Sequence, residues 1–267
     1  GFVTVPVRLD QLGEIKWQKF FDEADKFRFI PIIRLATSHN GKYWERPTKY
    51  DIVKFAGFFS KLDWHRGELI VIAFNEPNHA PEWGGKVDPA NYGASLTFLV
   101  DWFATEPKQY LVLPAALDAA AGNSPATMAL NLFLERLISE FPETIDKLAG
   151  WNSHAYPNPG FAGNPTDSHK MSVRSYQYEL DEIKKRTGKD LPAYITETGW
   201  DQNKVKIKLI PQYFQFAYQK IWQPDDRVMA ITPFLFNAQT MPFSAFSLLD
   251  TNEKPTLVYE MIKKLTL

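Results

Sequence analysis

The chain has 267 residues, and 30 Lys and Arg against 31 Asp and Glu give a formal net charge of -1. Because phosphate contacts need clustered Lys and Arg, this balance argues against a protein that binds nucleic acid through a basic face. The sequence contains no Cys, which excludes disulfides, thiolate nucleophiles and Cys-ligated zinc. No stretch reaches the roughly 18–20 apolar residues that a membrane span requires.

Short runs rich in β-branched and aromatic residues predict seven strands. In chain order, these strands are Phe2–Leu9, Phe29–Leu35, Leu69–Phe74, Tyr110–Pro114, Gly150–Ala155, Ala193–Thr196 and Val228–Phe236. Segments with apolar residues at helical spacing separate the strands, and two of them follow start signals, Asp88-Pro89 and Ser124-Pro125. The helices expected from this spacing are Trp17–Phe27, Ile52–Phe59, Tyr92–Phe103, Ala126–Glu140, Val173–Arg186, Val205–Trp222 and Pro255–Leu265.

The alternation of strands and helices predicts an α/β fold with parallel strands joined by right-handed crossovers. Seven such units with nearly continuous apolar strands favour a TIM (β/α)8 barrel that forms a single domain over residues 1–267. Such a barrel needs an eighth strand, and we expect it to precede Gly1. An open doubly wound sheet is the alternative, but the sequence has neither a Gly-rich turn after its first strand nor a Walker motif.

Two carboxylates follow predicted strands directly, where barrel enzymes carry their catalytic residues. Glu76 lies in the segment Asn75–His79 after the third strand, and Glu197 lies in Glu197–Trp200 after the sixth. Each Glu alone would more often be a helix cap or a salt-bridge partner. As a pair facing each other across a barrel mouth, they are what glycosidic bond cleavage requires, with one carboxyl group as proton donor and the other as nucleophile or base.

Other polar side chains occur at the ends of the remaining strands. Arg8 ends the first strand and Arg34 lies at the end of the second. His154 lies near the end of the fifth strand and Tyr156 directly follows it, and their equal parity predicts that they lie on the same face. We expect these side chains to surround a substrate.

The segments Asn75-Glu76-Pro77 and Glu197-Thr198-Gly199-Trp200 resemble the signatures of clan A glycoside hydrolases, which are retaining enzymes on a β/α barrel. In that clan the acid/base Glu ends the fourth strand and the nucleophile ends the seventh. Here the two Glu residues end the third and the sixth visible strands. One strand before Gly1 would restore both positions.

The resemblance covers essentially the whole chain and implies roles for individual residues. Glu76 matches the acid/base residue, and Asn75 matches the neighbour that binds the sugar 2-hydroxyl group. Glu197 matches the nucleophile, and Arg8 matches an Arg that keeps the nucleophile ionised. Tyr156 matches the aromatic or His residue near the nucleophile, with His154 as an adjacent candidate.

One position departs from the clan pattern and leaves the identity of the bound sugar open. Many members carry a Trp platform after the last strand, whereas this sequence has Phe234, Phe236 and Asn237 there.

Three Trp residues, Trp44, Trp83 and Trp200, fall in predicted strand-to-helix loops. Exposed rings in such loops stack on the C–H faces of sugars, so we expect these three to bind substrate. The alternative for each is that it covers an edge of the barrel core. For His79, two residues after Pro77, we expect either a substrate contact or an influence on Glu76.

The sequence therefore predicts a retaining hydrolase that cleaves β-glycosidic bonds in an oligo- or polysaccharide, with endo-action favoured. The alternatives are a non-catalytic carbohydrate-binding barrel and a transglycosylase of the same fold. We expect no cofactor, and no metal because the His spacing fits no metal-binding pattern. The expected partner is a carbohydrate substrate, in an extracellular or cell-envelope location, with any targeting segment before Gly1. The sequence does not define the oligomeric state.

Overall fold

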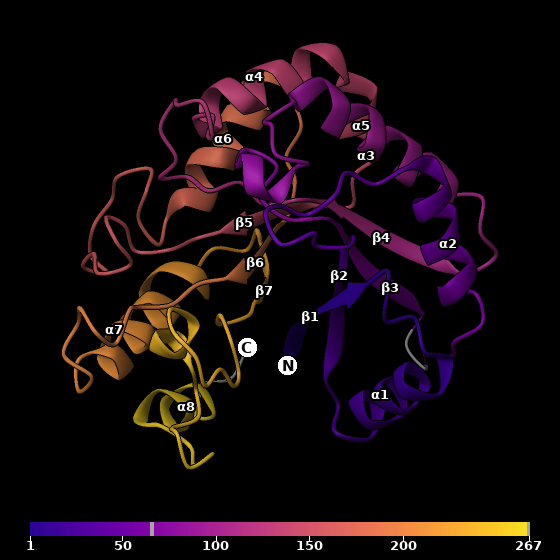
Figure 1. Ribbon diagram of the computed structural model, residues 1–267. Coiled ribbons are helices and arrows are strands. Elements are labelled where there is room, and N and C mark those ends of the chain that lie inside the picture. Colours follow the sequence, from indigo (N-terminus) through magenta and orange to yellow (C-terminus); the bar gives the residue numbers. More distant parts are fainter. Residues whose placement is uncertain (65–66, 266–267) are drawn as a thin grey trace. The chain divides into compact units, whose positions relative to one another are not determined.

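The computed structural model describes residues 1–64 and 67–265 (Figure 1). The chain divides into two compact units. Unit 1 comprises Gly1–Asn152 and Glu182–Leu191, and unit 2 comprises Ser153–Asp181 and Pro192–Leu267. The expectation that residues 1–267 act as one domain stays a prediction, as does the eighth strand before Gly1.

Unit 1 is built on a four-stranded parallel sheet (Figure 1). Its strands are β1 (Phe2–Arg8), β2 (Ile30–Ala36), β3 (Glu68–Ala73) and β4 (Gln109–Pro114), hydrogen-bonded in that order. In a parallel sheet all carboxyl ends meet at one edge, so the residues that follow these strands lie along a common edge.

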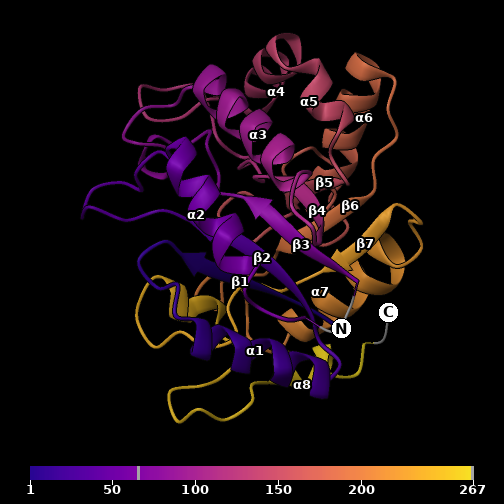
Figure 2. The ribbon, with the colours of Figure 1, turned by 90° about the vertical axis from the view of Figure 1, so that its right-hand side faces the viewer.

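Helices connect the strands of unit 1, and α1, α2 and α3 lie along one face of the sheet (Figure 2). The helices of this unit are α1 (Glu14–Lys26), α2 (Lys49–Phe59), the 3-10 turn η1 (Ala80–Glu82), α3 (Pro89–Phe103), α4 (Leu130–Glu140) and α5 (Pro142–Asp146).

Side-chain caps set two helix starts in unit 1. Thr48 and Asp51 form a reciprocal capping box at α2, in which each side chain accepts a hydrogen bond from the other residue's backbone N–H. The Asp88 carboxylate accepts the backbone N–H of Asn91 at 3.1 Å, which confirms the predicted start of α3.

The core of unit 1 consists of apolar side chains from the sheet and from the helices that cover it. Fully buried members are Ile33, Val71, Leu113, Phe55, Phe59, Leu96 and Phe133. Burial of this kind is the main force that holds the helices on the sheet.

Unit 2 contains the sheet ordered β5 (Trp151–His154), β6 (Ala193–Glu197) and β7 (Val228–Ile231), in which β6 and β7 pair in parallel. Strand β5 begins in unit 1 and ends in unit 2, as does α6 (Ser175–Thr187). The other helical elements of unit 2 are α7 (Ile210–Ala217), the π-helical turn η2 (Tyr218–Trp222), the 3-10 turn η3 (Phe243–Phe246) and α8 (Leu257–Ile262). Among the described residues, no helix combines the length and the apolar character needed to cross a bilayer.

All seven predicted strands are present, but the last is shorter than predicted. Strand β7 ends at Ile231, and Leu235 has a φ of 60°, a left-handed conformation that a strand does not tolerate. Beyond Ile231 the chain still follows β6, because the N–H groups of Thr232 and Phe234 donate to the carbonyls of Ile195 and Thr198 at 2.8 Å.

Four helices begin later than predicted, and the starts of two of them are displaced by a full turn or more. The helix expected from Ala126 begins at Leu130, because the Ser124 hydroxyl accepts the N–H groups of Ala126 and Thr127 in a local turn instead of capping a helix. The helix expected from Val205 begins at Ile210, with Pro211 in its first turn, where Pro is tolerated.

Candidate active site

The segment after β3 carries Glu76 on a backbone that few L-residues adopt. Phe74 has a φ of 74° and Glu76 a φ of 26°, both in the left-handed region. The backbone N–H of His79 donates to the carbonyl of Glu76 at 2.9 Å and closes the turn. Strained conformations of non-Gly residues persist only where their surroundings hold them, and they cluster at functional sites.

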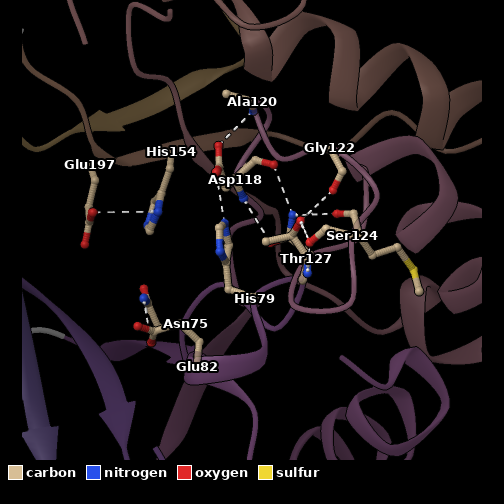
Figure 3. Close-up of polar contacts among 12 residues, drawn as sticks. Asn75, His79, Glu82, Asp118, Ala120, Gly122, Ser124, Thr127, His154 and Glu197 are labelled. Atoms are coloured by element: carbon tan, nitrogen blue, oxygen red, sulfur yellow. Dashed lines mark hydrogen bonds and ion pairs between the residues drawn. The ribbon is translucent and has the colours of Figure 1, made fainter. Parts of the chain in front are cut away.

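The amide of Asn75 is held on both sides by charged residues of unit 1. Its oxygen accepts a hydrogen bond from the Arg34 guanidinium at 2.9 Å. Its nitrogen donates to a Glu82 carboxylate oxygen at 3.0 Å (Figure 3). The structure thus brings together Asn75 and Arg34, two residues that the sequence predicted for the site. Glu82 was not predicted, because it lies in η1 and not directly after a strand.

His79 points toward Asp118, which follows β4, and their side chains lie 2.9 Å apart (Nε2 to Oδ2; Figure 3). The other oxygen of Asp118 accepts the backbone N–H of Ala120 at 2.7 Å, so the carboxylate is fixed. The sequence reasoning missed Asp118, although its place just past a predicted strand at the carboxyl edge of the sheet was a usable signal.

Asn78 is fully buried and ties the segment after β3 to the loop after β4. Its side-chain nitrogen donates to the carbonyls of Asp118 and Met128 at 3.0 and 3.1 Å, and its oxygen accepts the Asp118 N–H at 3.1 Å. A buried amide with three hydrogen bonds is a rigid anchor, since a loss of any partner would leave a buried polar group unsatisfied.

The pKa of His79 is raised above its ordinary value of 6.5. The largest cause is the hydrogen bond to Asp118, which outweighs the opposing effect of burial. The charges of Glu76, Asp118 and Glu82 raise it further. The ring therefore holds its proton to higher pH than a free His.

Arg8 and Trp44 contact each other within unit 1. The Arg8 guanidinium binds Asp10 through two hydrogen bonds of 3.0 and 2.6 Å, and its central carbon lies 5.7 Å from the centre of the Trp44 ring. The ring of His39 meets Trp44 edge-on at 5.1 Å. Trp44 is half-buried, so part of its ring stays accessible. The influence of Arg8 on the nucleophile stays a prediction.

Glu197 ends β6 in unit 2 and is held by the two residues predicted beside it. The Tyr156 hydroxyl donates to Glu197 Oε2 at 3.0 Å. His154 Nδ1 lies 3.7 Å from the same oxygen (Figure 3). Glu197 is 9% exposed and His154 is 3% exposed. A buried carboxylate with a fixed donor has a defined orientation, and the donated hydrogen bond stabilises its charged form.

The backbone around Glu197 is also fixed. The Thr198 hydroxyl donates to the Ala155 carbonyl at 2.7 Å, and the Thr232 hydroxyl donates to the Thr196 carbonyl at 2.7 Å. These bonds connect the carboxyl end of β6 to the segments after β5 and β7.

Phenylalanine rings surround Tyr156 in unit 2. Phe161, Phe234 and Phe246 meet its ring edge-on at centroid distances of 4.9, 6.0 and 6.1 Å. Phe234 also contacts Phe243, which is 50% exposed. Phe234, at a position where many clan members carry Trp, therefore belongs to an aromatic wall that reaches the surface.

Trp83 does not occupy the exposed position expected for a sugar-stacking residue. It is 1% exposed, its ring packs against Phe74 and Tyr92, and its Nε1 donates to Asn91 at 3.1 Å. The prediction of an exposed ring is wrong here, because the side chain fills the core under the turn after β3.

Trp200 is likewise buried, at 1% exposure. Its ring packs against Tyr213 and Phe214 of α7, and its Nε1 donates to the Gly163 carbonyl at 2.8 Å. The expected stacking role is wrong for this residue too. Its proximity to Glu197 in sequence was misleading, because contacts with α7 and Gly163 hold the ring in the interior of unit 2.

No protein-family model matches the sequence, and no curated protein matches it either. Solved structures with the same fold do match. A family 39 glycoside hydrolase from the gut symbiont Bacteroides cellulosilyticus WH2 is 14% identical with a TM-score of 0.64, over 97% of this chain and 56% of that chain. This chain thus spans little more than half the length of that enzyme.

Two further structures align with this chain over a larger share of their own length. A glycoside hydrolase 5 lichenase from Caldicellulosiruptor sp. F32, solved with cellotetraose, is 15% identical with a TM-score of 0.62, over 98% of this chain and 78% of that chain. Fungal β-1,4-galactanases give 10% identity and a TM-score of 0.67, over 98% of this chain and 88% of that chain.

These structures are clan A glycoside hydrolases with TIM-barrel folds, so the predicted fold class is confirmed. The chain has the α/β fold of that clan, and the family within the clan is not assigned. At 10–15% identity the likeness defines the fold alone.

Proposed function

We propose that this protein is a retaining glycoside hydrolase that cleaves β-glycosidic bonds in an oligo- or polysaccharide. The observation that carries the proposal is the environment of Glu197. This carboxylate ends a barrel strand, accepts a hydrogen bond from Tyr156 at 3.0 Å and has His154 at 3.7 Å. A carboxylate fixed in this way suits a nucleophile, whose attacking oxygen must be aligned with the anomeric carbon.

In the first step, a Glu197 oxygen attacks the anomeric carbon of the bound sugar. The glycosidic C–O bond breaks, and the Glu76 carboxylic acid gives its proton to the departing oxygen. The leaving sugar departs as an alcohol, and a glycosyl ester remains on Glu197.

In the second step, the Glu76 carboxylate takes a proton from water, and the water oxygen attacks the anomeric carbon. The ester bond breaks and Glu197 returns as a carboxylate. Glu76 ends the cycle protonated, and the sugar leaves with its original anomeric configuration.

The neighbouring side chains support this chemistry. The Asn75 amide nitrogen carries two protons, of which one reaches Glu82 and the other is suited to a sugar hydroxyl. Arg34 orients that amide from the opposite side. In this proposal Arg8 keeps the nucleophile charged.

Accessible aromatic rings favour an extended sugar chain as substrate, cleaved internally. Trp44 in unit 1 is half-buried, and Phe243 in unit 2 is 50% exposed. Both lie in segments that follow strands, where subsites of a barrel enzyme are built. A polymeric substrate also favours an extracellular or cell-envelope location.

A mechanism-based label tests the proposal. The chain is incubated with 2,4-dinitrophenyl 2-deoxy-2-fluoro-β-glycosides of several sugars, and the modified peptide is identified by mass spectrometry. We expect a glycosyl ester on Glu197. A label on another residue, or none with any sugar while the protein is folded, would contradict the assignment.

Substitution of the two carboxylates separates their roles. We expect Glu197→Gln and Glu76→Gln each to abolish most turnover of a natural substrate without unfolding the chain, as monitored by circular dichroism. Glu23→Gln, at an exposed position in α1, is the matched control. Near-normal activity of either active-site variant would overturn its role.

A further inference from the structure

We propose that the charged pair His79–Asp118 is a positioning device for the acid Glu76, in which the protonated His79 ring stabilises the carboxylate that forms when Glu76 releases its proton. This inference rests on the proposed function, because it assigns a role within the acid half of the reaction. It concerns unit 1 alone.

The first support is the way in which the segment after β3 is fastened to the loop after β4. Asn78 makes three hydrogen bonds to Asp118 and Met128, and the Met128 N–H donates back to the Asn78 carbonyl at 2.9 Å. The Ala80 N–H donates to the Ala126 carbonyl at 2.7 Å. His79 lies between these contacts, so its ring has little freedom to move away from Asp118.

The second support is the direct connection between His79 and Glu76. The His79 N–H donates to the Glu76 carbonyl at 2.9 Å and closes the turn in which Glu76 has a φ of 26°. The unfavourable backbone of Glu76 must be held by its surroundings, and the fastening of His79 to Asp118 provides that support.

The third support is the charge around the ring. Three carboxylates act on His79: Glu76 from the segment after β3, Glu82 from η1 and Asp118 from the loop after β4. The raised pKa of His79 agrees with a ring that keeps its proton to higher pH than a free His. Positive charge beside an acid stabilises its conjugate base, and here that base forms in the transition state.

Leaving-group dependence tests this role, because help from a general acid matters for poor leaving groups and hardly for good ones. His79→Gln and Asp118→Asn are compared with the unmodified chain on a dinitrophenyl glycoside and on an oligosaccharide of the same sugar. For His79→Gln we expect kcat/KM to fall about tenfold or more on the oligosaccharide and less than about twofold on the dinitrophenyl glycoside.

The pH dependence separates the two variants. The loss of oligosaccharide kcat/KM in His79→Gln, relative to the unmodified chain, should become smaller as pH rises through the pKa of His79. At high pH the His79 ring of the unmodified chain loses its charge as well. Asp118→Asn removes the main cause of that raised pKa, so this variant should regain oligosaccharide activity as pH falls and its His79 is protonated again. His79→Gln cannot regain activity in this way.

His169→Gln is the matched control, since His169 is an exposed His that lies 3.9 Å from Asp167. His169→Gln should change kcat/KM neither on the oligosaccharide nor on the dinitrophenyl glycoside. Equal losses of kcat/KM on both substrates, or losses that do not change with pH, would overturn the positioning role. Asp118→Asn still tests that role if His79→Gln does not fold. Failure of the unmodified chain to cleave any glycoside would instead overturn the proposed function.

Discussion

Among single side-chain groups, the Tyr156 hydroxyl is the one that most directly orients the proposed nucleophile, Glu197. It donates to Glu197 at 3.0 Å, while the ring is enclosed by Phe161, Phe234 and Phe246. The aromatic contacts hold the ring in place independently of the hydroxyl. Removal of the hydroxyl alone should therefore affect catalysis and not the fold.

For Tyr156→Phe we expect kcat to fall about 10- to 100-fold, since a hydrogen bond to a charged group contributes roughly 1.5–3 kcal/mol. The thermal unfolding temperature should change little. Steady-state kinetics and a melting curve check both statements, and an unchanged kcat would show that the hydrogen bond has no part in turnover.

At the level of residues, the sequence identifies candidate site residues where the proposed reaction requires a particular type of side chain. Tyr156 contacts Glu197, as the clan resemblance implies, and Arg34 contacts Asn75, a pairing that was not predicted. The errors concern Trp83 and Trp200, which are buried. A loop position does not reveal whether a large ring turns to solvent or into the core, because that depends on packing partners far away in sequence.

Gly93 shows how an element limits substitution. It lies inside α3, where Ala would normally be the more stable residue. A Cβ there would lie 2.2 Å from the Phe141 ring, which is too close for any real contact. The glycine lets α3 approach the end of α4 closely.

We expect Gly93→Ala to lower the free energy of unfolding by about 1–3 kcal/mol through overpacking. Gly57→Ala in α2 is the control, because a Cβ added at Gly57 would meet none of the described residues within 4 Å, and it should raise stability by up to about 1 kcal/mol. Chemical denaturation measures both. A stabilising Gly93→Ala would mean that Phe141 moves aside at no cost.

Asp225 fastens α6 to the turn before β7 in unit 2. Arg227 donates two hydrogen bonds to it at 2.9 and 2.8 Å, and the Tyr176 hydroxyl donates at 3.0 Å. These contacts, those from Arg227 above all, hold the pKa of the Asp225 carboxyl well below its ordinary value. The folded state therefore keeps the carboxylate charged at pH values at which the unfolded chain takes up a proton.

Because the folded pKa is lowered, this contribution to stability is complete above the unfolded value of about 3.9 and is lost as pH falls toward the folded value. We expect the free energy of unfolding of the unmodified chain to fall more steeply below about pH 4 than that of Asp225→Asn. Exposed Asp226 supplies the control, Asp226→Asn, which should follow the unmodified chain. Parallel curves for Asp225→Asn and the unmodified chain would contradict this account.

Element prediction succeeds where periodicity is strong and fails where local hydrogen bonds compete. All seven strands appear. The start of α4 was misplaced because the hydroxyl of Ser124 bonds within a turn, and the end of β7 was misplaced because Leu235 is left-handed. Neither interaction leaves a periodic trace in the sequence.

At the level of the whole molecule, the residues for the two halves of the proposed reaction belong to different units. The acid Glu76 and its support by His79 and Asp118 belong to unit 1, whereas Glu197 and Tyr156 belong to unit 2. Glu76 and Glu197 were both singled out by strand-end motifs, because parallel strands deliver their carboxyl-terminal residues to one edge of their sheet. Asp118 and Glu82 were not predicted, since their function depends on neighbours brought together only by the fold.

The most direct test of the account is a crystal structure of the whole chain, in which the distance between the carboxyl groups of Glu76 and Glu197 is measured. A retaining enzyme requires about 5–5.5 Å across a shared opening, and that is the separation we predict. A separation of about 6.5–9.5 Å would indicate inversion and contradict the mechanism. Carboxyl groups that do not face one opening would contradict the active site itself.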